Sequence, residues 1–147
     1  MTARIPTAVV ALSVPLAIIG AVLAGYLAIE NLQGQTGVCV GVHGCSTVQN
    51  SRYGKPFGVP ISIPGLLGYL AMLALAIAWL RDFQGRRLEI AFAGFLAAFA
   101  GVLVSGYLTY IEGFVVDAWC SYCIVSALLM VGLFAIWSGI LVHSMRE

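Results

Sequence analysis

Four long apolar stretches without Asp, Glu, Lys or Arg constrain this chain more than any other feature of its sequence. They run over residues 5–29, 56–80, 90–111 and 118–145. Each is long enough to cross a hydrocarbon core of about 30 Å as a helix, which takes about 20 residues. Inside lipid every backbone amide needs a partner within the protein, and the alternating pattern of barrel strands is absent. We therefore expect an all-α integral membrane protein with a bundle of four transmembrane helices.

The composition agrees with a chain that lies almost wholly in a bilayer. Hydrophobic residues make up 61%, charged residues 9%, and the mean hydropathy is +1.02, far from the roughly half-apolar, quarter-charged average of soluble domains. A net charge of +1 gives no reason to expect a nucleic acid partner. One membrane domain is expected over residues 1–147, with helices at about 6–29, 58–80, 89–111 and 118–143 and an outer loop at about 30–57. A cleaved signal peptide is the alternative for the first stretch, although that stretch is long for one.

The basic residues predict the orientation of the bundle. With four helices, five basic residues fall on one side and two on the other: Arg4, Arg81, Arg86, Arg87 and Arg146 against Arg52 and Lys55. Short cytoplasmic segments carry the excess of basic residues in membrane proteins. We therefore expect both termini in the cytoplasm and the loop at about 30–57 on the outer side of the inner (plasma) membrane.

All four cysteines then fall on the outer side. Cys39 and Cys45 lie in the loop segment "CVGVHGC", and Cys120 and Cys123 lie in "WCSYC", where the fourth helix enters the membrane. Outside the cytoplasm thiols can be oxidised and stay oxidised. A structural zinc site is one alternative, but its cysteines usually pair at closer spacing than the loop pair has. Structural disulfides are another, and they suit the loop pair better than the C-x-x-C, which closes too small a ring to stabilise much.

The C-x-x-C is placed for thiol exchange. The positive end of a helix dipole favours a thiolate, and Asp117 is positioned to cap the helix by accepting the amide of Trp119 or Cys120. Cys120 and Cys123 share one helix face, with Cys123 one turn deeper in the membrane. A deep thiol needs an electron acceptor that dissolves in lipid. Quinone fits because it takes two electrons and two protons, as the oxidation of one dithiol requires.

The order of these motifs resembles the vitamin K epoxide reductase family, in its bacterial thiol-oxidising branch. The resemblance covers about residues 37–130: the loop cysteines, the run "CSTVQNSRYGKPFGVPISIPGLLGYLAML", and the "WCSYC" that opens the fourth helix. The four-helix DsbB family does the same work, but it places its C-x-x-C in the first outer loop and the wider pair in the second. This chain has the reverse order.

The resemblance implies an electron relay. A DsbA-like or thioredoxin-like protein gives electrons to Cys39 and Cys45, which pass them to Cys120 and Cys123, and Cys123 touches the quinone, a ubiquinone or a menaquinone. The segment Ser46–Tyr53 resembles the family's short extracytoplasmic half-helix over the site. Many bacterial members continue into a fused thioredoxin-like domain, whereas this sequence ends at Glu147. We therefore expect the redox partner to be a separate periplasmic protein.

Two further functions stay open. One is a vitamin K epoxide or quinone reductase, although an asparagine and a tyrosine of the animal vitamin K-recycling members correspond to Ile61 and Ala127 here. The other is a non-catalytic bundle with structural disulfides. It predicts a static Cys39–Cys45 bond and no consequence from the loss of Cys123.

Two features of the third stretch receive no chemical role. Small residues recur at every fourth position, as Ala97–Gly101–Ser105 and as Gly94–Ala98, and such stripes most often mean close helix packing. The segment "EGFVVD", residues 112–117, is expected to form a short acidic turn on the outer side.

Overall fold

The described part of the chain is entirely helical apart from its turns. The structure, a computed structural model, describes residues 4–33, 52, 55–81 and 85–146. Its elements are α1 (Arg4–Leu32), a 3-10 turn η1 (Pro56–Gly58), α3 (Ser62–Leu80), α4 (Arg87–Phe114) and α5 (Ser121–Arg146). The four long helices are all long and apolar enough to span a membrane. The predicted four-helix membrane bundle is confirmed.

The helix ends differ from the predicted ones at two important places. Helix α3 begins at Ser62 rather than at about 58, because the chain before it turns through left-handed conformations at Phe57 (φ 57°) and Gly58 (φ 79°). Helix α4 continues to Phe114, beyond the predicted end at about 111. The half-helix expected over Ser46–Tyr53 lies outside the described residues except for Arg52.

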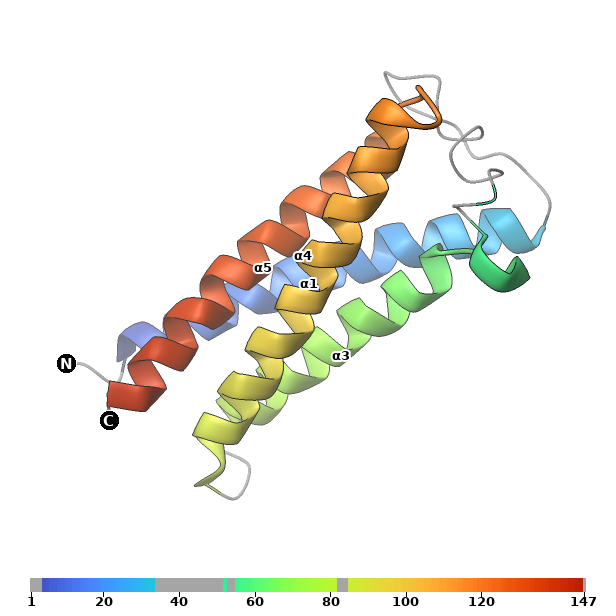
Figure 1. The fold of residues 1–147 in the computed structure, drawn as a ribbon. Helices are drawn as coiled ribbons and strands as arrows, with labels where there is room; N and C mark the ends of the chain where they lie inside the picture. Colours follow the sequence, from blue (N-terminus) through green and yellow to red (C-terminus); the bar gives the residue numbers. More distant parts are fainter. Residues whose placement is uncertain (1–3, 34–51, 53–54, 82–84, 147) are drawn as a thin grey trace.

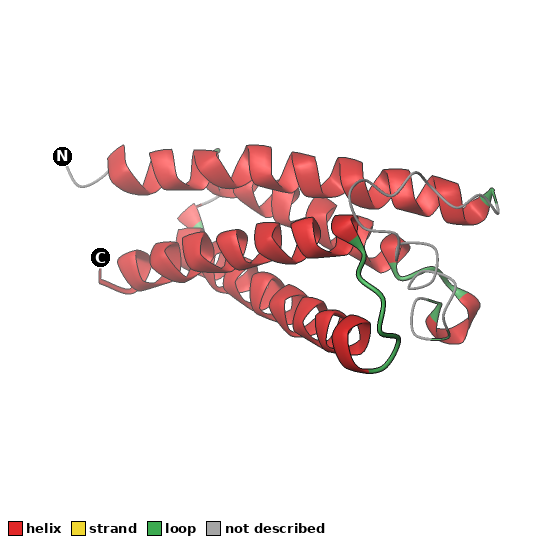
Figure 2. Cartoon of the chain, turned by 90° about the horizontal axis from the view of Figure 1, so that it is seen from above, coloured by secondary structure: helices red, strands yellow, loops and turns green. Residues whose placement is uncertain are grey.

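The helices form a ring in which each packs mainly against two others. Helix α1 packs against α3 and α5, and α4 packs against α5 and α3. The two ends of the chain lie at the same end of the bundle, as four spans require, and the α4–α5 connection lies at the opposite end, on the same side as η1 (Figures 1 and 2). The diagonal neighbours are therefore α1 with α4 and α3 with α5.

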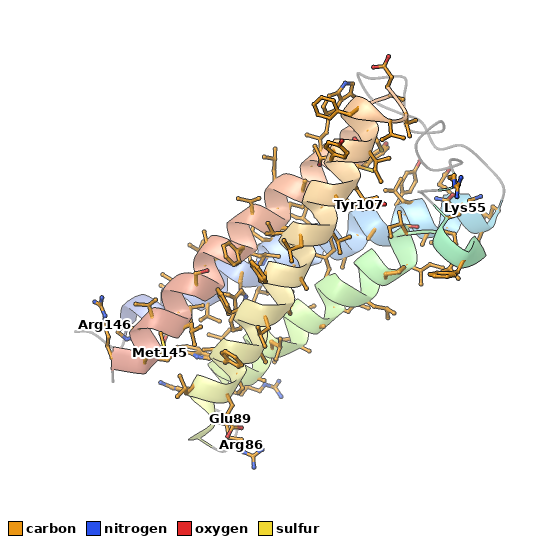
Figure 3. All side chains as sticks on the ribbon, viewed as in Figure 1. Lys55, Arg86, Glu89, Tyr107, Met145 and Arg146 are labelled. Atoms are coloured by element: carbon orange, nitrogen blue, oxygen red, sulfur yellow. The ribbon has the colours of Figure 1, made fainter. Side chains whose placement is uncertain are left out.

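Charged and aromatic side chains gather at the two ends of the bundle. Arg86 and Arg146 lie at the end that holds the termini, and Lys55 lies at the other end (Figure 3). At the terminal end, the Arg87 guanidinium lies 4.9 Å from the centre of the Trp79 ring and so links α3 to α4. Exposed aromatic residues follow the last turns of α4 and the α4–α5 connection: Tyr107, Tyr110, Phe114 and Trp119. Amphipathic aromatic residues favour this depth in a bilayer.

Large side chains fill the interior by lying against glycines. The Trp137 ring of α5 is fully buried and lies on Gly94 of α4, and the Tyr69 ring of α3 lies on Gly20 of α1. A Cβ at either glycine would overlap the ring. Within lipid no hydrophobic force drives helices together, so membrane helices depend on close packing contacts of this kind. The close packing predicted for Gly94 is confirmed.

Candidate active site

The connection between α4 and α5 brings the C-x-x-C back alongside the last turns of α4. The Val116 amide donates to the Ile111 carbonyl at 2.9 Å, and the Ala118 amide donates to the Glu112 carbonyl at 3.0 Å. Asp117 between them adopts a left-handed conformation, with φ 52°. These bonds reverse the chain within a few residues. The start of α5 therefore lies next to the end of α4.

Cys120 stands at the start of α5 and is fully buried. Its carbonyl accepts the Ile124 amide at 3.0 Å, which makes it the cap position of the helix. Its own amide donates to Oε2 of Glu112 at 3.4 Å. The prediction that Asp117 caps this amide is therefore wrong: the extra turn of α4 places the Glu112 carboxylate there instead.

Cys123 lies one turn further along α5 and faces the interior of the bundle. Both cysteines are thiols, Cys120 buried and Cys123 partly buried. The Cys123 side chain interacts with the thiol of Cys120 and with the side chain of Glu112. The structure thus brings the two predicted residues of the C-x-x-C together, and it adds a carboxylate to them.

Cys123 also lines a cavity of about 380 Å³. All four long helices contribute to its walls, which are mostly apolar: Leu23, Ala24 and Leu27 from α1, Pro64, Gly65 and Met72 from α3, Ala97, Gly101 and Val104 from α4, and Met130 from α5, among others. Cavities of this size and character hold small organic ligands. On α4 the stripe Ala97–Gly101–Ser105 borders the cavity, and the close packing predicted for it is found at Gly101, which lies against Met130 of α5.

The polar groups of the cavity are few and mostly paired. The Tyr69 hydroxyl donates to the Ser126 carbonyl at 2.8 Å and lies 2.7 Å from Oγ of Ser126. Oγ of Thr109 donates to the Ser105 carbonyl at 2.8 Å. Oγ of Ser62 is buried and has no hydrogen-bond partner among the described residues. It is therefore available to a ligand that carries an acceptor oxygen, which fits a quinone.

Glu112 is the residue of this site that the sequence analysis missed. It was expected in an exposed acidic turn, but it lies within α4 and is only 1% exposed. Oε1 has no hydrogen-bond partner among the described residues. An ionisable residue inside a membrane-spanning helix is a functional candidate by default, because its burial is costly. That signal was present in the sequence, one residue past the predicted helix end at about 111.

The loop cysteines Cys39 and Cys45 lie outside the described residues. The chain leaves the described part at Gln33, after α1, and returns near η1, at the same end of the bundle as the α4–α5 connection (Figure 1). Within the described ranges no three His, Cys, Asp or Glu side chains come together to hold a metal ion. The zinc alternative depends on the loop pair, so it is not tested.

A bundle of membrane-spanning helices with two neighbouring thiols, one of which lines a mostly apolar cavity, defines an integral-membrane protein built for thiol redox chemistry. Comparison with known families agrees with this class. The model of the Vitamin K epoxide reductase family matches residues 11–137, which is most of the chain. The chain belongs to this family of quinone-linked membrane oxidoreductases. The resemblance to this family found in the sequence is confirmed.

Proposed function

We propose that this protein is a quinone-dependent thiol oxidoreductase that reoxidises a thioredoxin-fold partner and so supports disulfide bond formation. The position of Cys123 carries the proposal. Its thiol lines the apolar cavity, while Cys120, its partner in the C-x-x-C, is buried beside it at the end of the bundle where the first loop attaches. One couple can thus serve both a lipid-soluble acceptor in the cavity and a thiol donor at the outer end of the bundle.

The electron path runs through two cysteine pairs. The partner's dithiol reduces a Cys39–Cys45 disulfide, and a loop thiolate then attacks Cys120, which breaks the Cys120–Cys123 disulfide and leaves Cys123 as the departing thiolate. The second loop thiolate displaces Cys120 from this mixed disulfide, so the Cys39–Cys45 bond forms again and both Cys120 and Cys123 are reduced. Reoxidation of Cys120 and Cys123 forms their S–S bond again and releases two electrons and two protons. A quinone accepts both, so the stoichiometry closes with one dithiol for each quinone.

The cavity supplies what a quinone head group needs. Its walls are mostly apolar, and the Ser62 hydroxyl is a donor without a described partner. Hydrogen bonds from such donors orient a ligand in an otherwise apolar pocket. Ubiquinone and menaquinone both carry acceptor oxygens and both meet this requirement. Bound quinone supplies the electron acceptor, while the protein holds Cys123 at the wall of its site.

The orientation follows from the charged ends of the bundle. Arg86 and Arg146 lie at the end that holds the termini, and Arg81 caps the C-terminus of α3 at the same end. The positive-inside rule assigns that end to the cytoplasm. Residues 1–147 then form one domain of the inner membrane, and all four cysteines lie on the periplasmic side. The partner is a DsbA-like or thioredoxin-like protein of that compartment.

Reduction of an epoxide is the second candidate, since the family takes its name from it. Ile61 lines the cavity. The animal vitamin K-recycling members, by resemblance, carry an asparagine at the corresponding position. An isoleucine side chain offers no hydrogen bond to an epoxide oxygen. We therefore place quinone reduction first.

The test is turnover by the purified protein in lipid nanodiscs. A reduced thioredoxin-fold donor and a short-chain ubiquinone or menaquinone are supplied, and quinol formation is followed by absorbance. We expect one quinol for each donor dithiol oxidised, and none in Cys123→Ser. Vitamin K epoxide in place of the quinone should give little product. A protein that consumes the epoxide and leaves both quinones untouched would contradict the proposal.

A further inference from the structure

We propose that Glu112 is the catalytic proton acceptor for the Cys123 thiol when the Cys120–Cys123 couple is oxidised. This inference rests on the proposed function, because it describes the proton that accompanies the electrons to quinone. It assigns a role to the one acidic side chain that the described residues of the site contain.

Glu112 is buried more deeply than a residue that only caps a helix needs to be. Its side chain is 1% exposed near the end of a membrane-spanning helix, where a carboxylate loses its water. In return Oε2 accepts one hydrogen bond, from the Cys120 amide, and at 3.4 Å that bond is long. Serine, asparagine or aspartate are common caps. A glutamate here costs stability that one long hydrogen bond does not offset.

The second carboxylate oxygen is placed to take a proton. Oε1 is buried without a hydrogen-bond partner among the described residues, and the Glu112 side chain interacts with Cys123, whose thiol carries the proton in question. The bond from Oε2 to the Cys120 amide fixes the carboxylate at the start of the C-x-x-C. A general base has to be held within reach of the proton it removes.

The step balances with the groups at hand. The Cys123 thiol gives its proton to the Glu112 carboxylate, and the resulting thiolate is the reactive form of the residue. Formation of the Cys120–Cys123 bond then releases two electrons to the quinone, and the second proton, from Cys120, also goes to the quinone. Glu112 passes the Cys123 proton on to the reduced quinone and returns to the carboxylate for the next cycle.

If Glu112 had only a structural role, removing its charge would have the opposite effect on the rate of quinone reduction from the one that a general base predicts. A carboxylate next to Cys123 repels the thiolate, because like charges disfavour each other in a site of low dielectric. If Glu112 served only as a cap, Glu112→Gln would keep an acceptor oxygen for the Cys120 amide and remove the repulsion. Quinone reduction would then stay the same or become faster. If Glu112 is the base, the same change makes it slower.

The experiment measures quinone reduction with dithiothreitol as the donor, so that the loop cysteines and the protein partner are not needed. Wild type is compared with Glu112→Gln, Glu112→Asp and the control Glu89→Gln, which removes an exposed carboxylate near the start of the same helix. We expect Glu112→Gln to lower kcat about 100-fold or more, within the range of general-base catalysis, with the KM for quinone little changed. Glu112→Asp should retain more activity than Glu112→Gln, and Glu89→Gln should match wild type.

The outcomes separate the two proposals. A Glu112→Gln rate equal to or above that of wild type, or a glutamine variant more active than the aspartate variant, overturns the role of Glu112 and leaves the proposed function standing. A wild type that reduces no quinone overturns both. If the glutamine variant does not fold, as judged by its thermal melt, Glu112→Asp decides alone. A lowered kcat with unchanged KM then supports the base, and full wild-type kcat contradicts it.

Discussion

The Tyr69 hydroxyl of α3 meets the Ser126 hydroxyl of α5 at 2.7 Å, across the diagonal of the bundle and one turn beyond Cys123. Both residues line the cavity, and the Tyr69 hydroxyl also donates to the Ser126 carbonyl at 2.8 Å. The ring of the same tyrosine lies on Gly20 of α1. One side chain therefore fixes α3 against two neighbours at the level of the cavity.

Tyr69→Phe should destabilise the bundle while leaving the ring in place. It removes the hydroxyl that bonds to Ser126, and the lost hydrogen bond should lower the free energy of unfolding by about 1 kcal/mol. Thermal unfolding in detergent would show a lower melting temperature. Ser126→Ala is the matched change on the other helix. The two effects should be less than additive, because both variants break the same contact. Full additivity would mean that the hydroxyl pair contributes nothing.

Gly94→Ala should be far more harmful than a glycine replacement elsewhere in the bundle. A Cβ at Gly94 would overlap the buried Trp137 ring, whereas a Cβ at Gly139 of α5 meets no atom within 4 Å. Overpacking of this kind typically costs about 1–3 kcal/mol. We expect a marked loss of thermal stability for Gly94→Ala and none for Gly139→Ala, which also gains helix propensity. Equal melting temperatures would contradict the packing of α4 on α5.

The helices and the C-x-x-C were predictable because each depends on a local pattern. An uncharged apolar run of bilayer length specifies a helix by itself, and two cysteines at i and i+3 share a face whatever surrounds them. The cavity could not be predicted in this way, because no local sequence pattern specifies it. Gly94 and Gly101 look alike in the sequence, and each lies against a side chain of α5, Trp137 at Gly94 and Met130 at Gly101, yet only Gly101 also borders the cavity. Which one does so depends on the side chains of the neighbouring helix.

Glu112 was missed through a small error in a helix boundary. The apolar run stops at Ile111, so the sequence predicted that the helix stops there too. In the structure α4 continues to Phe114, held by the bonds of the α4–α5 connection, and the carboxylate turns inward to the Cys120 amide. Helix boundaries are the least certain part of sequence reasoning. Here the boundary decided whether Glu112 was assigned to an exposed turn or to the site.

The proposed orientation predicts which cysteines a membrane-impermeant thiol reagent reaches. On intact, reduced cells Cys39 or Cys45 should be labelled, because the basic residues at the terminal end hold that end in the cytoplasm. Cys120 should resist labelling in a variant that keeps it as the sole cysteine, since it is fully buried. Labelling of the loop cysteines only after the membrane is opened would reverse the orientation. The oxidising compartment, and with it the oxidase role, would then be lost.

The relay predicts a trapped disulfide when Cys123 is replaced. In Cys123→Ser the Cys120 thiolate can still attack the Cys39–Cys45 disulfide and form a bond with one loop cysteine, but no Cys123 thiol remains to displace that cysteine. A disulfide between Cys120 and Cys39 or Cys45 should therefore accumulate while the donor is supplied. Peptide mapping under non-reducing conditions identifies it. Recovery of only an intact Cys39–Cys45 pair would show that the two pairs do not exchange.

The central claim is that Cys120 and Cys123 form the couple on the quinone side and the loop cysteines form the couple on the donor side. Quinol formation by purified Cys39→Ser and Cys123→Ser, each with dithiothreitol and with a reduced thioredoxin-fold protein, tests it directly. Dithiothreitol is small enough to reduce Cys120–Cys123 without the loop pair. We predict that Cys39→Ser reduces quinone with dithiothreitol and fails with the protein donor, while Cys123→Ser fails with both. Equal loss of both activities in the two folded variants would contradict the claim.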